Sequence, residues 1–165
     1  MKNLKIRYQM VKDAADFFQI LKNPNFIYFF VNVDSLAEEK AMLKKNTERR
    51  RNNESYNYTF LYKNKVVGGG GVRINHTRPY IGEIGYFLDE KYWGRGLTTA
   101  AVKLMEQEAF NKLGISRIEV IMRPENKASE KVAIKNGYKK EGRLKKYIKD
   151  KEGNLCDCFI YAKVL

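Results

Sequence analysis

Apolar and polar residues recur with two different periods along this chain of 165 residues, and these periods predict its elements. Apolar positions that alternate with polar ones, or cluster with β-branched and aromatic residues, predict strands, whereas apolar positions three and four apart predict helices. Strands are predicted at residues 4–10, 56–62, 66–74, 81–88, 115–122, 138–149 and 155–164, and helices at residues 14–21, 36–51, 97–110 and 127–135. No linker, repeat or low-complexity segment interrupts this order, so we expect a single domain over residues 1–165.

Capping residues mark the starts of the first two predicted helices. Asp13 precedes a helix whose apolar face is expected to hold Ala14, Phe17, Phe18 and Leu21. Ser35 and Glu38 form a capping box for the second helix. Between the two helices, residues 25–33 carry a run of aromatic side chains. We interpret most of this run as core, with part of a substrate entrance as the alternative.

The segment at residues 80–110 carries the strongest chemical signal. A predicted strand is followed by Gly94-Arg95-Gly96 and then by a helix. The start of a helix leaves backbone N–H groups without partners, its dipole favours negative charge, and glycines let phosphate oxygens come close. The segment is therefore predicted to bind an anion; an ordinary connection between a strand and a helix is the alternative.

Spacing separates this segment from two common phosphate-binding motifs. A P-loop requires a Gly-Lys pair, which the sequence lacks, and a dinucleotide fingerprint requires a third glycine where Thr99 stands. What remains is Lys91-x-x-Gly94-x-Gly96. This pattern resembles the Gln/Arg-x-x-Gly-x-Gly/Ala signature of the GNAT superfamily of acyl-CoA-dependent N-acetyltransferases. Lys91 departs from the signature in residue type but keeps its positive charge.

A second segment narrows the resemblance to one branch of the superfamily. Residues 126–142 look like the Asn-x-x-Ser…Gly-Phe…x-Glu-Gly pattern of the RimJ/RimL-like enzymes, which acetylate the N-termini of ribosomal proteins. Tyr138 stands where Phe is usual. The matching positions are Asn126, Ser129, Gly137, Glu141, Gly142, Asp157 and Tyr161. The resemblance covers nearly the whole chain. It implies an α+β fold of the GNAT type, a mixed, mostly antiparallel sheet of about seven strands with helices on both faces.

The branch also implies two catalytic residues. Many GNAT enzymes carry a tyrosine acid seven residues after the asparagine, but Ala133 stands there. The branch has Ser129 instead, whose hydroxyl would donate to the departing thiolate of coenzyme A. Glu83 is the expected base, and Gly85 on the same strand face leaves room for an amine or water. A structural role is the alternative for each: Ser129 as part of a first helical turn after Asn126, and Glu83 as the partner of a neighbouring Arg or Lys.

The expected cosubstrate is acetyl-CoA, and the resemblance implies where it binds. The backbone of Phe87, Leu88 and Asp89 is expected to hold the pantetheine arm as if it were an added strand. Asn126 is expected to bind the arm near the thioester. The amide groups of the glycine turn are expected to bind the pyrophosphate, with contributions from Trp93, Gly94, Arg95, Gly96, Leu97 and Thr98.

Composition adds a strongly basic surface. The formal net charge is +13. Affinity for RNA or ribosomes would explain it, and a lysine-rich composition without a function is the alternative. Cys156, Cys158 and the single His76 do not supply the ligands of a zinc site, so we expect no metal. No apolar signal region or long apolar run is visible, which predicts a cytoplasmic protein without membrane contact.

The sequence does not identify the amine that accepts the acetyl group. An α-amino group has a pKa near 8, so about a tenth of it is neutral at pH 7, against about one lysine in 2,500. A single glutamate suits the easier deprotonation, which favours a protein N-terminus, in agreement with the branch. Two alternatives stay open: acetylation of a small amine such as an aminoglycoside or polyamine, and a GNAT-like module without catalysis that binds RNA or the ribosome.

Overall fold

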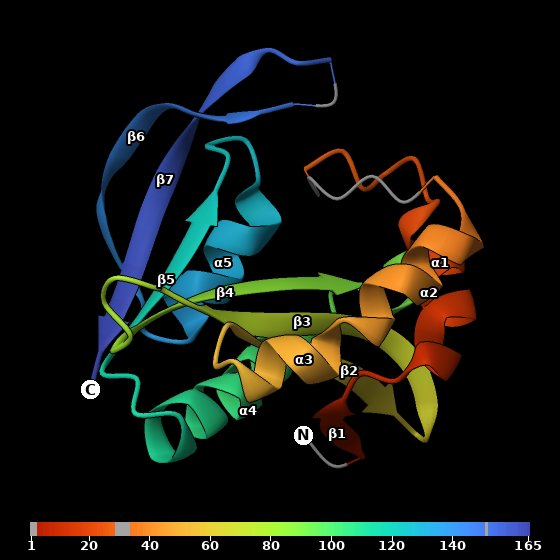
Figure 1. Cartoon of the computed structure of the whole chain (residues 1–165). Helices are drawn as coiled ribbons and strands as arrows, with labels where there is room; N and C mark the ends of the chain where they lie inside the picture. Colours follow the sequence, from red (N-terminus) through yellow and green to blue (C-terminus); the bar gives the residue numbers. More distant parts are fainter. Residues whose placement is uncertain (1–2, 29–33, 151) are drawn as a thin grey trace.

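Seven strands of the described residues form one sheet in the order β1-β2-β3-β4-β5-β7-β6 (Figure 1). The computed structural model describes residues 3–28, 34–150 and 152–165. The strands are β1 (Leu4–Tyr8), β2 (Ser55–Tyr62), β3 (Lys65–Ile74), β4 (Ile81–Leu88), β5 (Arg117–Met122), β6 (Lys139–Lys149) and β7 (Leu155–Val164). Within the described sheet, β4 and β5 are the parallel pair and the other neighbours are antiparallel. The expected mixed, mostly antiparallel sheet is confirmed.

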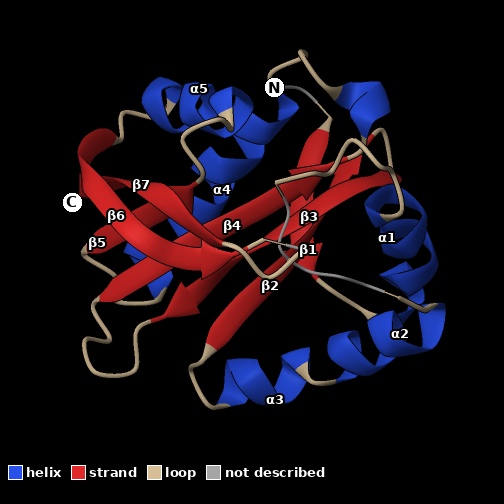
Figure 2. Cartoon of the chain, turned by 90° about the horizontal axis from the view of Figure 1, so that it is seen from above, coloured by secondary structure: helices blue, strands red, loops and turns tan. Residues whose placement is uncertain are grey.

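Helices cover both faces of this sheet, as Figure 2 shows from above. They are α1 (Ala14–Leu21), α2 (Leu36–Lys44), α3 (Asn46–Arg51), α4 (Leu97–Lys112) and α5 (Lys127–Lys135), with short 3₁₀ turns at η1 (Val11–Asp13) and η2 (Glu90–Tyr92). Helices α1 to α3 lie on one side, and α4 and α5 lie on the other. The sheet is therefore the middle layer of three.

Strand β4 contributes to the apolar core on each side because its side chains alternate between the two faces. Ile84 and Leu88 belong to the larger core, which includes Met105 of α4. Phe87 packs instead with Phe17 of α1 and Leu43 of α2. By the same alternation, Glu83 and Gly85 lie on the α1–α2 side of the sheet and Tyr86 lies on the α4–α5 side.

The helices on the α1 side differ from prediction in two respects. The segment expected as one helix after Ser35 is two, α2 and α3, which meet at Lys45. Helix α1 buries Ala14, Phe17 and Ile20. Ala14 and Phe17 of the predicted face are thus confirmed, whereas Phe18 and Leu21 are only half-buried. The sheet decides which residues are covered, and Ile20 completes the stripe that faces Phe87. Phe29 and Phe30 of the aromatic run lie outside the described residues.

Capping at Ser35 follows the prediction in part. The Ser35 hydroxyl accepts a hydrogen bond from the Glu38 amide at 3.2 Å. The Glu38 carboxylate, however, accepts from the amide of Asp34 rather than from that of Ser35. The helix start is therefore where the pattern predicts it, although the reciprocal bond of the box is shifted by one residue.

The four glycines of β3 mark a close backbone approach. A Cβ atom at Gly68 would overlap the carbonyl oxygen of Phe87, and one at Gly71 would overlap the side-chain oxygen of Asn57. The register between β2 and β3 also shifts between Phe60 and Leu61, opposite this run. Both consequences expected of a glycine-rich strand, a bulge and a tight approach, are present.

Candidate active site

The candidate site is organised around a split between β4 and β5. The two strands pair over three positions, from Ile81 opposite Arg117 to Glu83 opposite Glu119. Beyond Glu83 the register between them ends, although β4 continues to Leu88 and β5 to Met122. Among the described residues, no strand pairs with the edge of β4 that faces β5 over residues 84–88. Such an edge accepts an extended ligand by adding it as a strand.

Backbone alternation indicates which groups of β4 face the split. The Asp89 amide donates to the Val67 carbonyl of β3 at 2.8 Å, so this amide is already used. Alternation along an antiparallel pair then directs the polar groups of Phe87 toward β3 and those of Tyr86 and Leu88 toward the split. The Leu88 carbonyl accepts a hydrogen bond from the indole N–H of Trp93 at 2.7 Å. Of the three predicted backbone contacts, Leu88 is thus the one that faces the split, and Tyr86 joins it.

The glycine turn has the geometry of an anion site. Gly94 and Gly96 both adopt positive φ, at 73° and 74°. Gly96 is the N-cap of α4 and supplies no side chain to its first turn, which also contains no acidic residue. The sixteen-residue helix therefore directs its dipole and its first amides at the turn without a competing carboxylate. The residues from Trp93 to Gly96 are exposed, so a ligand can reach these amides.

Contacts around the turn connect it to the α1 side of the molecule. The Trp93 ring packs edge-on against Phe26, with 5.7 Å between ring centroids. The Arg95 guanidinium lies 5.5 Å from the centroid of the Tyr92 ring. The side chains of Asn23 and Asn25 donate to the Glu90 carboxylate. The segment after α1 and the turn before α4 are therefore held together at this end of β4.

Asn126 and Ser129 lie at the start of helix α5, which follows β5 in the chain (Figure 1). The Asn126 side chain caps the helix by accepting a hydrogen bond from the Ser129 amide at 3.1 Å. The structural alternative for both residues, a cap and a first helical turn, is therefore present. It leaves the Ser129 hydroxyl unused by the cap. That hydroxyl lies 2.8 Å from the hydroxyl of Tyr86 on β4.

Tyr86 is a candidate site residue that the sequence did not indicate. Burial raises the pKa of its phenol to about 12, so the phenol stays protonated at neutral pH. In the sequence Tyr86 lies two residues from Ile84 and two from Leu88, which marks it as core. The contact with Ser129 spans 43 positions, and no local pattern could have revealed it.

Glu83 lies at the inner end of the split and is paired with an arginine. Its carboxylate accepts a hydrogen bond from Arg73, directly opposite on β3, at 2.6 Å. The ion pair with a neighbouring arginine, the alternative to a catalytic role for Glu83, is therefore present. The Glu83 side chain is 32% exposed, and a Cβ atom added at Gly85 would meet nothing within 4 Å. The face beside Glu83 therefore has room for an acceptor.

Other charged and aromatic groups lie around Glu83. Arg117 binds two carboxylates, those of Glu119 and Glu141. Burial raises the pKa of Tyr147 on β6, and the negative charge of Glu83 adds to the effect. The hairpin of β6 and β7 thus brings a phenol toward the carboxylate of β4, and the carboxylates of this region are each bound by an arginine.

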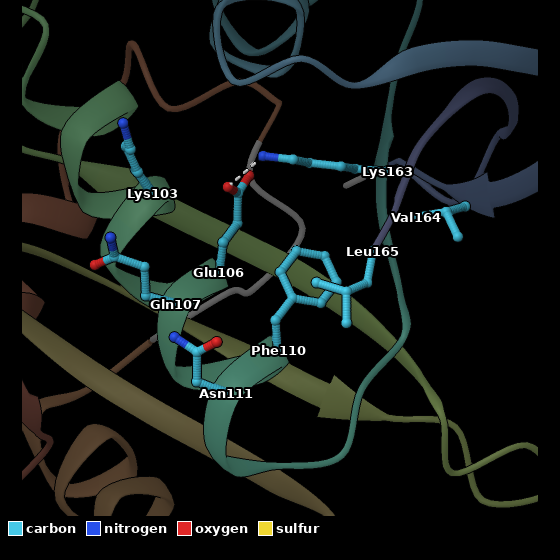
Figure 3. Close-up of a pocket in the computed structure, with 8 residues that line it drawn as sticks. All are labelled: Lys103, Glu106, Gln107, Phe110, Asn111, Lys163, Val164 and Leu165. Carbon is cyan, nitrogen blue, oxygen red and sulfur yellow. Dashed lines mark hydrogen bonds and ion pairs between the residues drawn. The ribbon is translucent and has the colours of Figure 1, made fainter.

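A cavity of about 390 Å³ lies elsewhere, between α4 and the end of the chain (Figure 3). Its lining residues are Lys103, Glu106, Gln107, Phe110, Asn111, Lys163, Val164 and Leu165. The buried Glu106 accepts a hydrogen bond from Lys163 at 2.8 Å, drawn as a dashed line in Figure 3. None of these residues is a predicted site residue. The cavity belongs to the packing of α4 against β7.

Among the described helices, none is long and apolar enough to cross a membrane. In residues 3–28, 34–150 and 152–165, no three side chains of the types that bind metals gather at one point.

Comparison with known proteins identifies the family. Residues 3–139 match the family described as an acetyltransferase (GNAT) domain. An uncharacterized N-acetyltransferase, p20 of Bacillus licheniformis, is 25% identical over 98% of this chain and 92% of its own length. The ribosomal-protein-serine acetyltransferase of Escherichia coli K12 is 24% identical over 99% of this chain and 88% of its own length.

A solved structure agrees with both relatives. The microcin C7 self-immunity acetyltransferase MccE, crystallised with acetyl-CoA and AMP, superposes with a TM-score of 0.89 at 25% identity. The match covers 100% of this chain and 94% of that one. The Escherichia coli relative is consistent with the RimJ/RimL-like branch that residues 126–142 indicate. Together with the β4–β5 split and the glycine turn before α4, these matches identify the chain as a member of the GNAT family of acetyl-CoA-dependent N-acetyltransferases.

Proposed function

We propose that this enzyme acetylates the N-terminal amine of a protein, such as a ribosomal protein, with Glu83 as base and Ser129 as acid. The observation that carries the proposal is the course of β4. The strand has Glu83 where the split begins, and the anion-binding turn follows its other end. Five residues of strand span about 17 Å. An extended pantetheine arm along this edge would bring its thioester toward Glu83 while its pyrophosphate meets the turn.

The proposed reaction is direct transfer. The neutral amine attacks the thioester carbonyl, so a C–N bond forms and the C–S bond breaks. Before the attack, the incoming ammonium loses a proton to Glu83, directly or through water. After it, the departing thiolate takes the Ser129 hydroxyl proton, and Ser129 regains a proton from the nitrogen of the new amide, relayed through water. The amides at Trp93–Thr98 and the side chain of Asn126 would hold the cosubstrate, with the backbone of Leu88 along the arm.

The charges around Glu83 support a protein N-terminus over a polyamine. A basic protein attracts a polycation only through a local excess of negative charge. Here Glu83 is bound by Arg73, and Glu119 and Glu141 share Arg117, so among these described residues near the split the excess is a single negative charge, small against the several positive charges of a polyamine. An α-amino group also needs less help to lose its proton. The name of the Escherichia coli relative, a ribosomal-protein-serine acetyltransferase, points the same way.

A contact with RNA or the ribosome stays a prediction from the net charge. The fold favours such a contact at strand β6, because this strand lies at the edge of the sheet and its lysines are exposed. These lysines are Lys139, Lys140, Lys145, Lys146 and Lys149. Binding through them would weaken steeply with salt.

The test of the acceptor is release of coenzyme A at pH 7 with four substrates at equal concentration. These are a peptide beginning with serine, the same peptide with a blocked N-terminus, free lysine and spermidine. We expect fast release with the open peptide and background release with the blocked one. A rate with spermidine equal to that with the open peptide would contradict a protein acceptor. Release above background with the blocked peptide would mean that the enzyme acetylates side-chain amines.

A further inference from the structure

The hydroxyl groups of Tyr86 and Ser129 form a close pair between the sheet and α5. Tyr86 lies on the α4–α5 side of β4 and packs against the larger apolar core. Its hydroxyl is 2.8 Å from the Ser129 hydroxyl and 3.3 Å from the Ser129 carbonyl oxygen. Both partners therefore belong to one residue, the one expected to donate a proton to the thiolate.

Two directions are open to the bond between the two hydroxyls, and the inference concerns the one in which the phenol donates. A carbonyl oxygen only accepts, so the phenol is the donor toward the Ser129 backbone. The phenol has one hydrogen, and either hydroxyl can be the donor in the shorter contact of 2.8 Å. When the phenol donates to that nearer oxygen, the Ser129 hydroxyl is the acceptor. A serine hydroxyl that accepts from one group keeps its own hydrogen for another. The Ser129 amide is occupied by Asn126, so the cap does not compete for that hydrogen.

We propose that Tyr86 is a positioning residue that orients Ser129, so that the serine proton points at the sulfur atom leaving the thioester. The inference rests on the proposed role of Ser129. It assigns to the phenol no direct contact with the acetyl group or the acceptor. A simpler role is docking of α5 on the sheet, and the structure offers a control for that role.

The control is Tyr161 on β7. Its hydroxyl donates to the Glu130 carboxylate at 2.6 Å. Glu130 is adjacent to Ser129 in the first turns of α5, so both tyrosines connect the same end of α5 to the sheet. Tyr161→Phe removes a phenol that holds α5 and leaves the Ser129 hydroxyl alone. Tyr86→Phe removes the one that reaches Ser129.

The first measurement is the pKa of the thiol of bound coenzyme A, read from thiolate absorbance, which needs no acceptor. A donor to sulfur stabilises the thiolate and lowers this pKa from its free value near 8.5. We expect Ser129→Ala and Tyr86→Phe to raise it relative to the parent enzyme, and Tyr161→Phe to leave it unchanged. An unchanged pKa in Tyr86→Phe, or an equal rise in Tyr161→Phe, would overturn the inference.

The second measurement is turnover at saturating acetyl-CoA, with any acceptor that is active. We expect Tyr86→Phe to lower kcat by about the same factor as Ser129→Ala, with an unchanged KM for acetyl-CoA. The double variant should be no slower than Ser129→Ala, because residues that act as one unit are not additive. If the kcat loss of the double variant equals the product of the two single losses, Tyr86 does not act through Ser129.

The outcomes separate this inference from the proposed function. If Ser129→Ala keeps the kcat and the thiol pKa of the parent enzyme, both the acid role of Ser129 and the inference about Tyr86 are contradicted. If Ser129→Ala lowers kcat and raises the thiol pKa while Tyr86→Phe behaves like the parent enzyme, the inference about Tyr86 is overturned and the acid role of Ser129 stands. Melting temperatures of all variants check that α5 stays folded.

Discussion

The proposed cofactor side and the proposed acceptor side of the split are built from different kinds of interaction. The proposed cofactor side depends on backbone: two glycines at positive φ and the uncapped start of α4. The acceptor side depends on side chains from separate strands, above all the pair of Glu83 and Arg73. A backbone site is specified within a few residues and tolerates change around it. A side-chain site depends on strand register, so it is where acceptor preference can vary within one fold.

The largest expected effect is on the acceptor side. Changing Glu83 to Gln removes the proposed base and should lower kcat at pH 7 by about a hundredfold, within the range of general-base catalysis. Raising the pH toward 9 should recover much of the loss, because an α-amino group with a pKa near 8 is then mostly neutral. The measurement is the pH profile of turnover at saturating acetyl-CoA.

The matched control is Glu119→Gln. Glu119 is in register with Glu83 on the neighbouring strand and is likewise bound by an arginine, so this variant removes a nearby carboxylate that has no proposed role in catalysis. We expect its kcat to stay within a few-fold of the parent. A parental rate and profile in Glu83→Gln would make Glu83 a structural partner of Arg73.

A smaller effect is expected on the cofactor side from Gly96→Ala. The added Cβ atom stands at the N-cap of α4, where the pyrophosphate is expected to approach, and should weaken acetyl-CoA binding by about tenfold or more, or about 1.4 kcal/mol. The measurement is the Kd for acetyl-CoA by calorimetry.

Gly114→Ala is the control variant for the backbone strain that Gly96→Ala introduces. Gly114 lies just past the other end of α4 with φ of 68°, close to the 74° of Gly96, and a Cβ atom there would meet nothing within 4 Å. Both variants should lose a similar amount of stability, since alanine at positive φ costs roughly 1–2 kcal/mol. Equal Kd values for the two variants would mean that the turn does not bind the pyrophosphate.

The smallest expected effect concerns a buried carboxylate on the acceptor side, Glu39 of α2. It is 4% exposed, and no hydrogen bond or ion pair reaches its carboxylate from the described residues. Burial raises its pKa. Folding therefore favours the protonated acid, so stability is highest below the unfolded pKa near 4.3 and falls as the pH rises through the folded value.

Glu39→Gln removes the charge and should raise the melting temperature at pH 7. A gain of about 1 kcal/mol corresponds to roughly 2–4 °C for a chain of this size. The gain should shrink toward pH 4. The adjacent Glu38→Gln is the control, because Glu38 is exposed and a glutamine can still accept from Asp34. A lower melting temperature for Glu39→Gln at pH 7 would mean that the carboxylate has a stabilising partner.

Sequence alone determined the elements and the chemistry that depends on near neighbours. The strand and helix order, the Ser35 and Asn126 caps and the glycine turn before α4 follow from periods and contacts of at most four residues. Family resemblance extended this to acetyl-CoA. The boundary between α2 and α3 and the buried stripe of α1 were wrong in detail because packing against the sheet decides them.

Only the tertiary structure decided which polar groups meet across the site. The pairing of Arg73 with Glu83 depends on the register of β3 and β4, and that of Tyr86 with Ser129 on how α5 packs against β4. Tertiary packing also decides the hydrogen bond from Trp93 to the Leu88 carbonyl and the point, at Glu83, where the pairing of β4 with β5 ends. Local patterns report which side of an element is apolar. They carry no information on which distant side chain lies opposite, because that is set by the packing of the whole sheet.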